Sequence, residues 1–173
     1  MDINETYMRE ALRQAEEAAS IGEVPVGAVV VRDGEIIAKA YNRVETDRNS
    51  SGHAEMLAIR EAERVLQSKW LTGCELYVTL EPCSMCGGAM VLARLDKLYI
   101  GAMDPKNGAC GSVFNVVQET RLNHRMEVET GILGEECGRI LSDFFRNMRA
   151  AKALKRKLRR ETASPDNTDG GID

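Results

Sequence analysis

Apolar residues in the first third of the chain change from helical spacing to strand spacing. Helical spacing over residues 4–20 predicts an amphipathic helix. Residues 26–42 contain two β-rich runs around Asp33 and Gly34, a strong hairpin signal. Polar and turn-forming residues dominate 43–52, so we expect a loop that leads into a histidine.

The next segments alternate between the two spacings. Residues 53–67 carry a helical stripe, and the near-continuous apolar run at 74–80 is typical of a strand covered on both faces. A second helix is predicted to start near Pro82, and 97–102 reads as a short strand. This alternation predicts a three-layer α/β sandwich with partly parallel pairing after an antiparallel hairpin.

The last third of the chain is less regular. Residues 102–125 are rich in turn formers and show no period, and a loop of this length is more often functional than idle. We expect a weak strand at 126–132 and a long helix from 134 to about 158. Residues 1–160 then form a single domain, and the polar end at 161–173 is predicted to be disordered.

A length of 173 residues fits one domain with a substantial core. No apolar run approaches the roughly 18 residues that span a membrane. The acidic N-terminus does not look like a secretory signal, so we expect a cytoplasmic protein with no membrane partner.

A formal net charge of −4 argues by itself against a nucleic-acid partner, but it is an average. Residues 146–160 hold eight basic side chains and no acid, which leaves −12 on the rest of the chain. A solvated helix face is the ordinary interpretation of such a run. A basic cluster on an acidic body also offers phosphates a place to bind.

The five cysteines are an odd number, so a disulfide framework is improbable. Cys83 and Cys86 stand three residues apart where a helix is expected to begin, close enough to bind the same ion, and His53 opens another predicted helix. A helix N-terminus also favours the thiolate that a metal requires. Two thiolates and one imidazole would hold Zn²⁺ and leave its fourth position open, as in catalytic zinc sites.

Glu55 lies two positions after His53, so on a helix it points elsewhere and should not be a fourth ligand. Zinc lowers the pKa of bound water to around 7, and a neighbouring carboxylate can take up and pass on the proton. A hydroxide nucleophile with a proton shuttle is what hydrolytic removal of an amino group from a heteroaromatic ring requires.

Each motif alone has another interpretation. A Cys-x-x-Cys pair could be a thioredoxin-like redox pair, and a histidine at a helix start is more often a cap than a ligand. Together, His-x-Glu and Pro-Cys-x-x-Cys at two predicted helix starts favour a zinc deaminase site.

With these motifs the chain resembles the cytidine-deaminase-like superfamily, and within it the bacterial tRNA-specific adenosine deaminases. The resemblance runs from roughly residue 7 to 149. Besides the zinc motifs it is carried by the stretches PVGAVVV, GHAEMLAI, LYVTLEPCSMCGGAM, GAMDPKNGACGS, NHR at 123–125 and GILGEECGRILSDFFRNMR. The last three stretches favour the tRNA enzymes over deoxycytidylate, guanine or riboflavin-pathway deaminases.

The resemblance implies a mixed five-stranded central sheet between helices, and a homodimer whose partner chain contributes to each RNA site. It implies one Zn²⁺ per subunit on His53, Cys83 and Cys86, with Glu55 as the catalytic acid and base. The reaction would convert adenosine to inosine at wobble position 34 of tRNA(Arg), with zinc-bound hydroxide attacking C6. The implied contacts with the substrate are Asn42, Ala54, Asp104, Lys106, Asn107, Asn123, Phe144, Phe145 and Arg149.

Some alternatives stay open from the residues alone. Asn42 could serve only a turn or strand end, and Phe144 and Phe145 point about 100° apart on a helix, so at most one should face RNA. The same chemistry could act on a free cytosine or guanine compound. A redox or zinc-stabilised binding module without catalysis is a more distant alternative.

Overall fold

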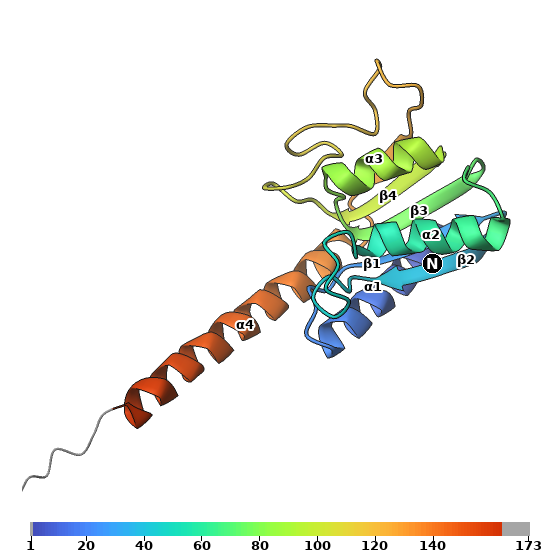
Figure 1. Cartoon of the computed structure of the whole chain (residues 1–173). Helices are drawn as coiled ribbons and strands as arrows, with labels where there is room; N and C mark the ends of the chain where they lie inside the picture. Colours follow the sequence, from blue (N-terminus) through green and yellow to red (C-terminus); the bar gives the residue numbers. More distant parts are fainter. Residues whose placement is uncertain (1, 164–173) are drawn as a thin grey trace, which may run out of the picture.

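The structure of the chain, a computed structural model, describes residues 2–163 (Figure 1). Four helices and five strands alternate along it. In chain order they are α1 (Ile3–Ser20), β1 (Gly27–Arg32), β2 (Glu35–Tyr41), α2 (Ala54–Leu66), β3 (Cys74–Leu80), α3 (Ser84–Ala93), β4 (Lys97–Ala102), β5 (Glu127–Thr130) and α4 (Gly134–Thr162).

The strands form one mixed sheet in the order β2-β1-β3-β4-β5. The β1 strand is antiparallel to both β2 and β3, whereas β3, β4 and β5 are parallel. Helices α2 and α3 cover one face of the sheet, and α1 with the start of α4 covers the other (Figure 1). The predicted three-layer α/β sandwich with a mixed five-stranded sheet is confirmed.

Alternation along the central strands supplies both apolar cores. In β1, Ala28 and Val30 face the cluster under α2 and α3, whereas Val29 and Val31 face the cluster under α1 and α4. All four are nearly or completely buried. A strand buried on both faces needs a near-continuous apolar run, which is why the runs in β1 and β3 predicted central strands.

The hairpin and the long irregular segment were also predicted correctly. Asp33 and Gly34 both have positive φ, at 50° and 77°, as a tight hairpin turn requires. In the segment between β4 and β5, the pairing recorded among described residues is one isolated bridge, Cys110 with Asn115.

Two boundaries differ from the prediction. The second motif helix starts at Ser84 rather than near Pro82, because Cys83 has extended backbone angles and is the N-cap. The Pro82 carbonyl instead accepts a hydrogen bond from Ala109. The last helix runs to Thr162, past the expected end, and Ala163 is its C-cap, so 161–163 are ordered rather than disordered as predicted. The remainder of the predicted tail, 164–173, lies outside the described residues.

The topology brings the chemically important segments to one edge of the sheet. Because β2 and β3 both run opposite to β1, they end at the same edge, and β4 ends there too. The loop before α2, the start of α3 and the start of the segment after β4 therefore meet. Carboxyl edges of strands are where open α/β sheets place ligands. Within residues 2–163, no helix combines the length and apolar character needed to cross a membrane.

The packing of α1 on β1 provides a test of the fold. A Cβ atom at Gly27 would overlap the Ala11 carbonyl oxygen and lie 2.6 Å from the Ala15 nitrogen. We expect Gly27→Ala to reduce the free energy of unfolding by roughly 3 kcal/mol in urea denaturation, because backbone cannot move aside as a side chain can. The matched control is Gly138→Ala in α4, where nothing lies within 4 Å of the new Cβ; it should stabilise by about 0.5–1 kcal/mol. Equal effects of the two substitutions would contradict this packing.

Candidate active site

Two helix N-termini build the centre of the site. His53 is the N-cap of α2, Cys83 is the N-cap of α3, and Cys86 lies in the first turn of α3. The His53 Nδ1 atom is 3.7 Å from Cys83 Sγ and 3.5 Å from Cys86 Sγ. The His53 side chain makes no capping hydrogen bond to α2, so its ring is free to face the two sulfurs.

This triad fits a zinc ion by geometry and by chemistry. Its three ligand atoms all lie within 4.8 Å of one another. Tetrahedral zinc with ordinary Zn–S and Zn–N bonds places a nitrogen and a sulfur ligand about 3.5 Å apart, close to the two separations observed. One imidazole and two sulfurs are a donor set that zinc prefers, and three protein ligands leave a fourth position open.

The two sulfurs differ in how readily they lose a proton. Hydrogen bonds from the Cys86 thiol and from His53 lower the pKa of Cys83 to about 3, despite the cost of burial. The bond with Cys83, together with burial, raises the pKa of Cys86 above its ordinary value. The pair therefore shares one proton at neutral pH, and a cation bound to both sulfurs would release it.

Glu55 lies beside the triad without belonging to it. Glu55 lies in the first turn of α2 and is only 4% exposed. Burial raises the pKa of its carboxyl group, and hydrogen bonds from its own backbone amide and from Cys86 oppose that rise. A raised pKa brings a carboxyl group nearer to the operating pH, where an acid and base catalyst is most effective.

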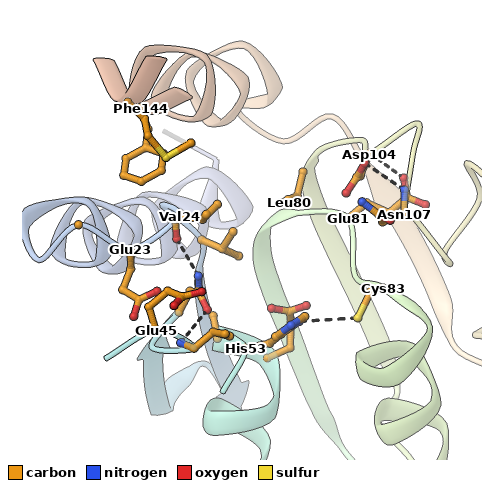
Figure 2. A pocket seen from close by; sticks show the side chains of 17 residues that line it. Glu23, Val24, Glu45, His53, Leu80, Glu81, Cys83, Asp104, Asn107 and Phe144 are labelled. Atoms are coloured by element: carbon orange, nitrogen blue, oxygen red, sulfur yellow. Dashed lines mark hydrogen bonds between the residues drawn. The ribbon is translucent and has the colours of Figure 1, made fainter. Parts of the chain in front are cut away.

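His53 and Cys83 of the triad, together with Glu55, line a pocket of about 630 Å³ (Figure 2). One side of the pocket comes from Val24 and the loop after β2, and another from Glu81 and the turn after β4. Phe144 of α4 also lines the pocket. The volume is ample for one purine base, since ligand pockets begin at about 300 Å³.

The structure brings some of the expected substrate contacts into this pocket and leaves others outside. The expected residues that line it are Asn42, Ala54, Asp104, Asn107 and Phe144. The remaining expected contacts are exposed and do not line it: Lys106, Asn123, Phe145 and Arg149. Next to Asn123, His124 hydrogen-bonds the Leu95 carbonyl oxygen at 2.6 Å and holds that loop in place.

Asn42 serves the strand end and faces the pocket as well. Its Nδ2 donates to the Val24 carbonyl at 3.2 Å, and its Oδ1 accepts from the Val44 amide at 3.4 Å. An amide group has a second proton and a second lone pair for a ligand. Of the two phenylalanines, Phe144 lines the pocket and Phe145 does not. The Phe145 ring packs edge-on against the Phe144 ring, with ring centroids 5.5 Å apart.

Sequence reasoning missed Glu81, which organises the far wall of the pocket. Its buried carboxylate accepts from the amides of Asp104, Cys110 and Ser112 at 2.9–3.1 Å, and from the Ser112 hydroxyl. Burial alone would raise the pKa of Glu81, but these donors lower it below its ordinary value. The only signal in the sequence was an acidic residue at the end of an apolar strand.

Glu23 was missed in the same way. It is 2% exposed, and one of its carboxylate oxygens accepts from both the amide and the hydroxyl of Thr46, at 2.6 and 2.7 Å. This fastens the loop between β2 and α2, which carries His53 at its end.

The fold and this site define a zinc deaminase of the cytidine-deaminase-like class. A model of the MafB19-like deaminase family matches residues 2–149. A solved structure from a study of A-to-I editing by tRNA:A34 deaminases at the wobble position of transfer RNA matches with a TM-score of 0.76 and 41% identity. It covers 79% of this chain and 99% of that chain.

Curated relatives narrow the class. The tRNA-specific adenosine deaminase of Bacillus subtilis (strain 168) is 53% identical over 91% of this chain and 98% of its own length. The enzyme of the same name from Aquifex aeolicus (strain VF5) is 52% identical over 84% and 95%. The chain therefore belongs to the family of tRNA-specific adenosine deaminases. A guanine deaminase from Nitrosomonas europaea is more distant, at 28% identity and a TM-score of 0.70 over 81% of this chain and 83% of that chain.

The Glu81 cluster can be tested apart from the chemistry. We expect Glu81→Gln to cost about 1–3 kcal/mol of stability, because a neutral amide accepts hydrogen bonds more weakly and brings donors of its own. Hydrogen exchange should accelerate at the amides of Asp104, Cys110 and Ser112. Glu127→Gln is the control, since Glu127 is exposed and its carboxylate pairs with Lys97 only at 3.9 Å. Unchanged exchange at all three amides would remove this role from Glu81.

Proposed function

We propose that this protein hydrolyses adenosine to inosine, releasing ammonia, at wobble position 34 in the anticodon of tRNA(Arg). The observation that carries the proposal is the conjunction of a His-Cys-Cys triad with a buried carboxylate beside it, at the wall of one pocket. The names and identities of the relatives support tRNA as the substrate class. The choice of tRNA(Arg) rests on the resemblance of the sequence to the family.

Proton movement is the part that the chain itself performs. A zinc ion held by the triad would supply the Lewis acidity that makes water nucleophilic near neutral pH. Glu55 accepts a proton from the attacking water and delivers it to N1 of adenine. It then takes the proton of the new hydroxyl group on C6 and delivers it to the departing amino group, which leaves as ammonia. Its burial keeps bulk water away from the carboxylate between these steps.

We assign recognition of the base to the pocket wall. Asn42 would hydrogen-bond the base through its unused proton or lone pair, and the backbone of Ala54 would help to position it. The turn at Asp104, Lys106 and Asn107 would contact the loop nucleotides around the base. The remaining contacts of the anticodon loop are assigned to Asn123, Phe144, Phe145 and Arg149.

Anticodon loops suit this pocket for a physical reason. Their bases are already partly unstacked, so turning one base outward costs at most a few kcal/mol. A base within a continuous duplex would have to lose both stacking partners and its pairing partner.

We also propose that the protein works as a homodimer in the cytoplasm, with one zinc ion in each subunit. Exposed apolar side chains on α3 and the segment after β4 support a partner surface: Leu92, Met103, Val113, Phe114 and Leu122. The segment is held against α3 at Gly87, where an added Cβ would lie 2.5 Å from the Val116 side chain. Exposed apolar side chains that form a contiguous surface are typical of a protein interface.

A free purine base is the second candidate substrate. The likeness to guanine deaminase favours it, and the pocket alone would admit such a base. The higher identity and nearly complete coverage of the tRNA enzymes make RNA the better proposal.

The role of Glu55 leads to a prediction. Glu55→Gln should retain about one zinc ion per chain by elemental analysis, because Glu55 is not a ligand, and should lose roughly 10²–10⁴-fold in kcat. Cys86→Ala should lose both zinc and activity. Near-normal turnover by Glu55→Gln would show that the proton shuttle has been wrongly assigned.

The substrate is tested with anticodon stem-loops and free nucleosides. Zinc-loaded protein should form inosine at position 34 of the arginine stem-loop, and should act poorly on adenosine, cytidine and guanine. KM for the stem-loop should rise steeply with salt, because binding to phosphates releases counterions. Comparable turnover of a free base, unaffected by salt, would instead establish the second candidate.

A further inference from the structure

The outer part of α4 is free of the domain. The helix is anchored near its start, where Cys137 is buried and a Cβ at Gly101 would overlap the Cys137 sulfur. From residue 145 to 163 every residue is exposed, and the helix extends away from the body (Figure 1). Among the described residues, the basic side chain of this outer part that forms an ion pair is Arg146, which pairs with Asp143.

One face of this free helix continues from the pocket. Met148 lines the pocket, and Lys152, Lys155 and Arg159 follow it at steps of four, seven and eleven residues. At 100° per residue these positions lie within an arc of about 60°, so they form one stripe. We call Lys152, Lys155 and Arg159 the α4 stripe.

The charged side chains that line the pocket are acidic rather than basic. Glu23, Glu45, Glu55, Glu81 and Asp104 line it, whereas none of the lysines or arginines within residues 2–163 does. An adenine base is neutral and can enter such a pocket, but the phosphates on either side of its nucleotide are repelled. Cations that neutralise the backbone must therefore lie outside the pocket.

We propose that the α4 stripe binds backbone phosphates of the base-paired stem next to the loop whose base enters the pocket. This inference rests on the proposed function. The stripe extends the pocket wall outward by about 17 Å from Met148 to Arg159, at 1.5 Å per residue. That length passes several phosphates of a duplex, and contact with the backbone needs no particular stem sequence.

Two matched double variants test the stripe. Lys155→Ala with Arg159→Ala removes two charges from it. Lys157→Ala with Arg160→Ala removes two charges at the same distance along α4, but these point about 170° and 110° away from its centre. We expect the first pair to raise KM for a stem-loop about tenfold near 0.1 M salt, with kcat unchanged, and the second pair to have a much smaller effect.

Stem length separates duplex contacts from general attraction. Lengthening the stem from about two to about six base pairs should lower KM for the wild type and the control pair, but not for the stripe pair. The stripe pair should also reduce the slope of log KM against log salt by roughly 1.5, about 0.7–0.9 for each lost phosphate contact.

Several outcomes would overturn the inference. Equal effects of the two pairs would mean general charge attraction, and a KM independent of stem length would remove the duplex. If the wild type and the control pair bind anionic vesicles and the stripe pair does not, while KM of the stripe pair is unchanged, the stripe is a membrane contact instead. If the wild type forms no inosine in any RNA, the proposed function fails; if it does and the stripe pair behaves as wild type, only the stripe assignment fails.

Discussion

The structure depends on two helix N-termini meeting at one edge of the sheet. His53 ends the loop before α2, and Cys83 ends the turn before α3, and their ligand atoms come within 3.7 Å. This requires β2 and β3 to run in the same direction with β1 between them. A helix N-terminus also stabilises a thiolate. The strand order that brings the ligands together therefore also places the cysteines where the charged form is favoured. Any change in that order would separate the imidazole from the sulfurs.

Buried carboxylates hold the walls of the site. Glu23 fastens the loop before α2, and Glu81 fastens the segment after β4. Neither segment has regular structure, so its backbone amides lack the carbonyl acceptors that a helix or sheet would provide. The carboxylates accept hydrogen bonds from these amides instead. Glu55 differs from these two because it faces the reaction centre, and burial there tunes its proton affinity. The same residue type, glutamate, therefore has a structural role at two positions and a chemical role at the third, depending on what its carboxylate contacts.

Charge is divided between two parts of the molecule. Carboxylates line the pocket, and the basic side chains of α4 lie along the part of the helix that extends away from it. Under the proposed function, this division would separate affinity from selection: a neutral base would enter the acidic pocket, and the backbone phosphates would bind outside it. A net charge of −4 conceals this arrangement because opposite contributions cancel in the sum.

Much of this protein could be predicted from local patterns. The alternation of apolar residues determined which segments became helices and strands, because each element buries one face or both. The motifs around His53 and Cys83 identified the zinc chemistry, because few sets of side chains suit such an ion. Local pattern failed at Pro82, where tertiary contact with Ala109 moved the helix start to Ser84.

Tertiary structure alone decided how distant segments share the site. Glu81 and Ser112 are far apart in the chain, and no spacing rule links a strand end to a loop that has no period. The strand order places Asp104, Asn42 and Phe144 around one pocket, whereas Lys106 and Phe145, next to pocket residues in sequence, remain outside it. Sequence determined the kind of chemistry because ligand type is a property of side chains. Only folding decided which side chains line the pocket, because that depends on contacts between segments that are far apart in the chain.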